Sequence, residues 1–130
     1  MGSGSSNGIG YIDKDESLYL INGINNEYGY VYLGKNNLAD FVFDHRFIFV
    51  DVEECDHYKI YEWTKSGLKM FASRYYPIHE KEYIGSTYVR NVYNLSRNIS
   101  KGKTFSLTSF NCKDWVEEFE NLFSFYDALG

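Results

Sequence analysis

The clearest pattern of hydrophobic and polar positions lies in the last part of the chain. From Cys112 onward, apolar side chains recur three and four residues apart, which places them along one face of a helix. The spacing therefore predicts an amphipathic helix that begins near Cys112 and buries one stripe of side chains. This stripe consists of Cys112, Trp115, Val116, Phe119, Leu122 and Phe123.

A second helix is predicted in the stretch "TYVRNVYNLSRNIS", where Val89 and Val92 begin a helical spacing. Thr87 or Ser86 is the expected N-cap, and Gly102 is the expected stop. Between the two predicted helices, "TFSLTSF" has the composition of a short extended segment.

The middle of the chain has the pattern of strands. "FVFDHRFIFVDV" is aromatic and β-branched without helical periodicity, and "HYKIYEWT" follows it after the polar loop "EECD". These two segments predict an antiparallel hairpin. "SLYLINGINNEYGYVYLGKNN" predicts two more short strands, whereas "LKMFASRYYPIHEKEYIG" fits either a strand followed by a loop around Pro77 or a short helix. The predicted fold is therefore α+β, an antiparallel sheet packed against helices.

Length and composition indicate one domain. The chain has 130 residues, of which 44% are apolar and 19% aromatic, and Pro77 is the only proline. Such a chain can build a sizeable core, and no proline-rich linker divides it. We expect a flexible, Gly/Ser-rich lead over residues 1–10 and a single domain over residues 11–130.

Charge and cysteine usage narrow the class of partner. A net charge of −5 makes nucleic acid and anionic membranes poor partners. No apolar run reaches the length of about 18 residues that a spanning helix needs, and we see no signal peptide. Two cysteines do not make a disulfide framework. We expect a reducing, cytoplasmic location and no integral membrane segment.

The position of Cys112 at a helix start has chemical consequences. A thiol attacks as the thiolate, and the positive end of a helix dipole with its free backbone N–H groups stabilises that anion. The same amides can stabilise an oxyanion on a substrate carbonyl. Asn111, directly before it, is the expected N-cap or turn residue. The alternative is that Cys112 is simply a small apolar side chain in the buried stripe.

A thiolate nucleophile needs an imidazole, and His45 lies within the first strand of the predicted hairpin. If the hairpin loop is centred between residues 53 and 54, His45 pairs directly with Glu62, a carboxylate that could orient the ring. A register change of one residue would pair His45 with Trp63 or Tyr61 instead. A structural role for His45 stays open at this point.

The other two histidines lie outside this arrangement. His57 follows Cys55 and Asp56 in "CDH", but no second pair of ligands at a zinc-like spacing accompanies it. We therefore expect no metal and no other cofactor. His79 is expected to be exposed, and it is the alternative base.

A histidine on a strand, a polar residue on the next strand and a distant "NC" that opens a helix resemble the circularly permuted papain-like (NlpC/P60-type) cysteine hydrolases and acyltransferases. The stretch "NCKDW" is similar to the helix start of PPPDE-type and lecithin:retinol acyltransferase-like members. The resemblance implies a papain-like catalytic domain with Cys112 as nucleophile, His45 as general base and Glu62 as the orienting residue. Asp114 departs from the pattern, since relatives often have a histidine or another polar residue before the aromatic.

The function expected from these residues is that of a small cysteine hydrolase or acyltransferase acting on an amide, ester or thioester. Its substrate would be a peptide, a protein tail or an acyl compound. Two alternatives stay open: a degenerate, inactive member of the same fold, and a binding module with a tyrosine-rich recognition surface. The tyrosines in question are Tyr28, Tyr30, Tyr32, Tyr75, Tyr76 and Tyr83.

Overall fold

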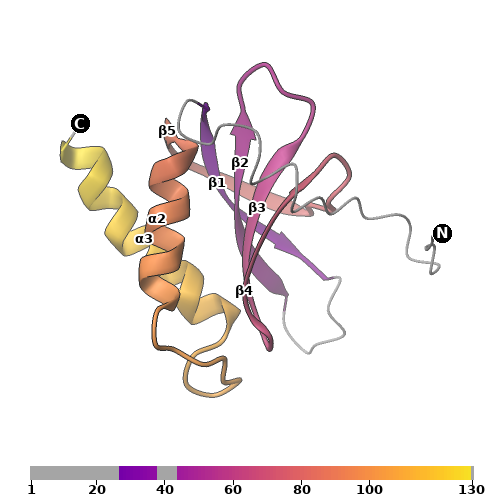
Figure 1. The fold of residues 1–130 in the computed structure, drawn as a ribbon. Helices are drawn as coiled ribbons and strands as arrows, with labels where there is room; N and C mark the ends of the chain where they lie inside the picture. The colour runs from indigo at the N-terminus through magenta and orange to yellow at the C-terminus, as the bar shows by residue number, and fades with distance from the viewer. Residues whose placement is uncertain (1–26, 38–43, 130) are drawn as a thin grey trace.

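A computed structural model of the chain describes residues 27–37 and 44–129 (Figure 1). The expected lead over residues 1–10, the first strand of the "SLYLINGINN" region and residues 41–43 at the start of the predicted hairpin strand lie outside the described residues. The elements are β1 (Tyr28–Asn36), β2 (His45–Val52), β3 (Tyr58–Thr64), β4 (Gly67–Ser73), β5 (Glu80–Tyr88), α2 (Val89–Ser100) and α3 (Cys112–Leu129).

The strands form one five-stranded antiparallel sheet in the order β4-β3-β2-β1-β5. Four strands follow one another as a meander, and the chain then crosses the sheet to add β5 beside β1. This crossing segment is tied to the end of β1, because the Asn36 side chain donates to the Pro77 carbonyl at 2.9 Å and the His79 N–H donates to the Lys35 carbonyl at 2.8 Å. The ambiguous segment around Pro77 is thus strand, loop and strand, not a helix.

The register of the β2–β3 hairpin differs from the prediction. The paired positions run from Ile48 opposite Tyr61 to Asp51 opposite Tyr58, two residues away from the predicted alignment. A direct pairing of His45 with Glu62 was therefore wrong. A shift of two residues preserves the faces of a strand, so both side chains still lie on the same side of the sheet.

The two strands of this hairpin also separate at one end. Pairing between β2 and β3 stops at Ile48 and Tyr61, although β2 continues to His45 alongside β1 and β3 continues to Thr64 alongside β4. The sheet therefore opens between β2 and β3 at the end that carries His45 and Glu62.

Both helices cover one face of the sheet (Figure 1). The stripe of α3 packs there as predicted, with Trp115 and Phe119 fully buried and the leucine of the stripe, Leu122, half-buried. A smaller aromatic cluster occupies the opposite face. It consists of Phe47, Phe49, Ile60, Phe71 and Tyr76. The α+β class is confirmed, and within the described residues neither helix has the length and apolar character needed to cross a membrane.

The start of α2 differs from the prediction. Thr87 and Ser86 still pair with β1 as part of β5, so neither can cap the helix, and the cap position falls to Tyr88, which makes no side-chain capping bond. Gly102 has φ +73°, a left-handed conformation that suits the predicted stop after α2. The "TFSLTSF" segment is a tight turn closed by a bridge between Ser106 and Phe110, not a strand.

Candidate active site

The first turn of α3 is fixed by a reciprocal capping arrangement. The Asp114 N–H donates to the Asn111 side-chain oxygen at 3.1 Å, and the Asn111 N–H donates to the Asp114 carboxylate at 3.0 Å. Asn111 is therefore the N-cap, and Cys112 is the first helical residue. Asp114, which departs from the pattern of the resembled enzymes, has a local role in this cap.

Two tryptophan side chains form hydrogen bonds that position the start of α3, one just before Cys112 and one just after it. The Trp63 indole N–H donates to the Phe110 carbonyl at 3.2 Å, and the two rings meet edge to face. The Trp115 indole N–H donates to the Ser100 hydroxyl at 3.0 Å, which ties α3 to the end of α2. These bonds fix where the thiol enters the opening between β2 and β3.

His45 and Glu62 meet across this opening. The His45 Nε2 atom lies 2.8 Å from the Glu62 Oε1 atom, and both residues are buried. Tyr76, brought here by the segment that crosses the sheet, donates its hydroxyl to the same oxygen at 2.5 Å. The Asn36 side chain in turn bonds to the Tyr76 hydroxyl. The carboxylate is thus held by two donors.

The Cys112 thiol hydrogen-bonds to the His45 side chain. The backbone N–H groups of Arg46 and Lys113 also donate to the sulfur. Lys113 contributes from the first turn of α3, and Arg46 contributes from the part of β2 that is no longer paired with β3. The separated end of β2 and the start of α3 therefore meet at the sulfur of Cys112, a residue that is only 3% exposed.

These contacts change the ionisation of both groups. Burial acts to lower the pKa of His45, but hydrogen bonds to Cys112 and Glu62 and their charges outweigh it and raise this pKa to about 9. Burial acts to raise the pKa of Cys112, but His45 and the amides of Arg46 and Lys113 outweigh it, and the pKa falls below its ordinary value. Both shifts favour the same state, a thiolate beside an imidazolium.

The hydrogen bonds also determine the protonation of the ring. Burial and the Glu62 charge raise the pKa of Tyr76, so its hydroxyl keeps the proton that it donates to Glu62. The Glu62 oxygen that accepts the Tyr76 hydroxyl proton is the same oxygen that contacts His45. A carboxylate oxygen acts as an acceptor in both bonds, so the Nε2 atom of His45 carries a proton and donates it. The Nδ1 atom of His45 is then the nitrogen that can exchange a proton with Cys112. This is the arrangement that a thiol nucleophile and its base require.

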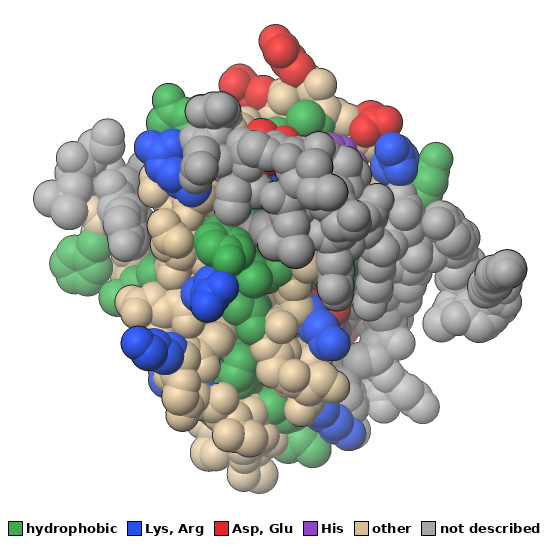
Figure 2. Space-filling model, in the orientation of Figure 1, with side chains coloured by type: hydrophobic (Ala, Val, Ile, Leu, Met, Phe, Trp, Pro, Cys, Tyr) green, Lys and Arg blue, Asp and Glu red, His purple; other side chains and the backbone are tan. Residues whose placement is uncertain are grey.

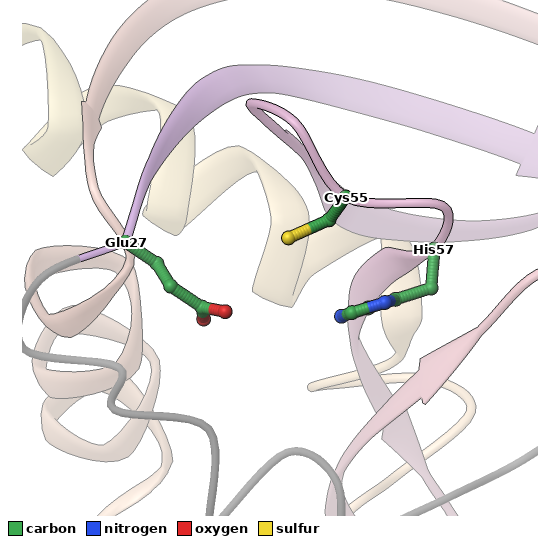
Figure 3. Close-up of side chains that lie close together, drawn as sticks. All are labelled: Glu27, Cys55 and His57. Carbon is green, nitrogen blue, oxygen red and sulfur yellow. The ribbon is translucent and has the colours of Figure 1, made fainter.

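The remaining sequence candidates fall into two groups. The side chain of His79 is exposed, on the crossing segment, outside this cluster. Cys55 and His57 lie at the opposite end of the hairpin, where Glu27 joins them (Figure 3). Their ligand atoms lie within 4.8 Å of one another. Among the described residues, this second cluster is the group of histidine, cysteine and carboxylate side chains that is close enough together to hold a metal ion.

Sequence reasoning missed two contributors to the Cys112 site. The sequence assigns Tyr76 to the tyrosines of a recognition surface or to half-buried strand positions, yet it is buried beside Glu62, whereas Tyr28, Tyr30, Tyr75 and Tyr83 are exposed. A buried glutamate needs donors, which signals that some partner exists, but nothing local to Glu62 points to Tyr76. The second contributor is the backbone N–H of Arg46. A backbone N–H is common to nearly all residue types, so the sequence does not indicate which one will contact the sulfur.

Comparisons with known proteins identify no relative: no family model, no curated protein and no solved structure matches this chain. The permuted papain-like resemblance therefore depends on the residues themselves.

Proposed function

We propose that the chain is a small cysteine hydrolase or acyltransferase that uses Cys112 as nucleophile and His45 as base. The observation that carries this proposal is the continuous bonding from the Cys112 thiol through the His45 ring to Glu62, with both pKa shifts favouring the ion pair. A buried structural cysteine needs no such partners.

In the proposed reaction, the Cys112 thiolate attacks a substrate carbonyl carbon, and the electron pair of the C=O bond moves to the oxygen. When the tetrahedral adduct collapses, the bond to the amine, alcohol or thiol leaving group breaks, and His45 gives that group its Nδ1 proton. Water or another acceptor then attacks the thioester after losing a proton to His45, and the thiolate returns. The backbone N–H of Cys112, at the start of α3, supplies a donor for the oxyanion.

The permuted papain-like architecture is part of the same proposal. It is supported by the order of His45 on β2, Glu62 on β3 and Cys112 at the start of a helix that packs on this sheet. Peptides, protein tails and acyl compounds are the proposed substrates. A reducing compartment such as the cytoplasm suits the mechanism because the thiolate must stay reduced.

The two cysteines allow an internal control for the test. The full chain is treated with a small neutral alkylating reagent between pH 5 and 10, and the rates at Cys112 and Cys55 are read separately by peptide mass spectrometry. We expect the Cys112 rate to reach its plateau below the ordinary thiol pKa, whereas the Cys55 rate follows a raised pKa. Acyl and protein-tail electrophiles then report the substrate class, with Cys112→Ala as the control that must lose covalent capture.

The rival function is recognition by exposed tyrosines. Tyr28 meets Tyr88 with ring centroids 5.1 Å apart, and Tyr30 meets Tyr83 at 6.3 Å, along the β1–β5 edge. Equal pH profiles for the two thiols would favour this module, or an inactive member of the fold, over the enzyme.

A further inference from the structure

The cluster of Glu27, Cys55 and His57 lies at the closed end of the β2–β3 hairpin, away from Cys112. Glu27 directly precedes β1, and the other two residues belong to the loop between β2 and β3. Figure 3 shows the carboxylate, the sulfur and the imidazole edge turned toward one common space. We propose that these three side chains bind a divalent metal ion of the zinc class, independently of the proposed catalytic role of Cys112.

The strongest evidence is the histidine. The side chain of His57 is only 6% exposed, and its buried Nε2 atom has no hydrogen-bond partner among the described residues. Burying an unpaired imidazole nitrogen is costly, so a partner for this atom is expected. The nitrogen lies among the ligand atoms of Cys55 and Glu27.

The other ring nitrogen of His57 contacts a carboxylate, as the second nitrogen of a metal-bound histidine usually does. The Nδ1 atom lies 3.4 Å from the Asp56 carboxylate, and Arg74 donates its Nε–H to that carboxylate at 3.1 Å. A carboxylate that accepts from Nδ1–H fixes the tautomer and leaves the Nε2 lone pair available for a metal.

Glu27 supplies an oxygen ligand. Its Oε1 atom has no hydrogen bond among the described residues, although the Lys59 ammonium lies 3.5 Å away as an ion pair. With Glu27 and Cys55 both negative, Lys59 positive and a divalent ion added, the cluster has a net charge of +1. Lys59 therefore offsets one negative ligand and does not exclude the metal.

Cys55 supplies the sulfur and an entry route. It is exposed, and its thiol loses a proton when a metal ion binds to the sulfur. Acidic side chains gather over this end of the molecule (Figure 2), where the loop carries Glu53, Glu54 and Asp56. Their field favours the approach of a cation.

The ligand types favour zinc. Thiolate, imidazole and carboxylate together match the donor set of Zn²⁺, and three protein ligands leave a fourth position for water or a further ligand. Zn–ligand bonds of about 2.0–2.3 Å require the three atoms to move closer than their present spread of up to 4.8 Å. Cys55 is exposed and lies in a loop, so it can make this movement.

The site can be tested with Co²⁺, which replaces Zn²⁺ and reports a thiolate ligand through a charge-transfer band in the near ultraviolet. The full chain is stripped with a chelator and titrated with Co²⁺, then with Zn²⁺. We expect one equivalent of tetrahedral Co²⁺, displaced by Zn²⁺. Cys55→Ser should remove the band, and Asp56→Asn should weaken binding about 10- to 100-fold by releasing His57.

The matched control is Cys112→Ala, since Cys112, His45 and Glu62 also combine sulfur, nitrogen and oxygen. This variant must keep the band. A second measurement needs no variant: Zn²⁺ should protect Cys55 of the unmodified chain from alkylation at least 10-fold more than it protects Cys112. A chain without a band, or a band that survives Cys55→Ser and disappears with Cys112→Ala, would overturn the proposal.

Discussion

A cysteine, a histidine and a glutamate lie together at each end of the β2–β3 hairpin, but the contacts of the two cysteines differ. At the open end, His45 bonds to Cys112 and to Glu62, and the thiol pKa is lowered. At the closed end, His57 leaves one nitrogen without a described partner, and the pKa of Cys55 is raised. The residue types alone therefore do not decide the chemistry.

The difference follows from what surrounds each sulfur. The Cys112 sulfur accepts hydrogen bonds from the backbone N–H groups of Lys113 in the first turn of α3 and of Arg46 in the part of β2 that does not pair with β3. These donors stabilise a thiolate anion. At Cys55, burial and the carboxylate of Glu27 oppose ionisation of the thiol. The first environment suits a nucleophile, and the second suits a metal ligand.

The largest expected effect comes from removing the imidazole at the open end. His45→Ala should lower the alkylation rate of Cys112 at pH 7 by about 10- to 30-fold, because the thiol returns to a few per cent ionised. Any hydrolytic turnover should fall about 10²- to 10⁴-fold. The rate at Cys55 should not change. His79→Ala, which alters an exposed histidine, is the control. If the alkylation rate of Cys112 is unchanged in His45→Ala, His45 does not activate this thiol and the proposed difference between the two cysteines is wrong.

A second effect concerns the carboxylates that hold the two histidines. Glu62→Gln should destabilise the fold by about 3–5 kcal/mol, because it removes the buried carboxylate that pairs with the buried His45 imidazolium. Asp56→Asn, the corresponding change beside His57, alters an exposed side chain and should cost much less. Urea unfolding of both variants measures the contrast. Similar losses would show that the burial of Glu62 does not matter.

The third effect is on the titration of His45. Removing the thiolate with Cys112→Ala should lower the His45 pKa from about 9 by one unit or more, which corresponds to about 1.4 kcal/mol. Since this pKa lies above the ordinary value of 6.5, the stabilisation is complete below about pH 6.5 and is lost as the pH rises through about 9. NMR titration of the ring resonances checks the shift, and an unchanged pKa would contradict the thiolate–imidazolium pair.

The smallest effect comes from the helix cap. Asn111→Ala should cost about 0.5–2 kcal/mol and raise the pKa of Cys112, because the Asp114 N–H in the first turn of α3 loses its acceptor, the Asn111 side-chain oxygen. Asn121→Ala makes the same change at an exposed position in the interior of α3 and should be nearly neutral. Thermal unfolding and the alkylation profile of Cys112 measure both quantities, and the pH profile of Cys55 should stay the same.

The sequence predicted the parts of the fold that depend on local pattern. The stripe of α3, the hairpin around residues 53–56 and the meeting of His45 with Glu62 could be expected from spacing and alternation. The hairpin register was wrong by two residues because loop length alone does not determine where pairing stops.

Contacts between distant segments could not be predicted. Tyr76 reaches Glu62 because its loop crosses the sheet, and Glu27 reaches His57 because β1 pairs beside β2. Both contacts depend on the strand order, which periodicity does not report. The same limit explains why the "CDH" stretch alone did not reveal that Glu27 lies beside Cys55 and His57.

The early separation of β2 from β3 places His45 and Glu62 in two separately paired halves of the sheet. His45 is secured through β1 and Glu62 through β4, with only the positions from Ile48 to Asp51 joining the halves. A slight change in the angle between these halves would lengthen the bond from His45 to Glu62 while leaving each ladder intact. A change in this angle would therefore alter the basicity of the imidazole without unfolding any strand.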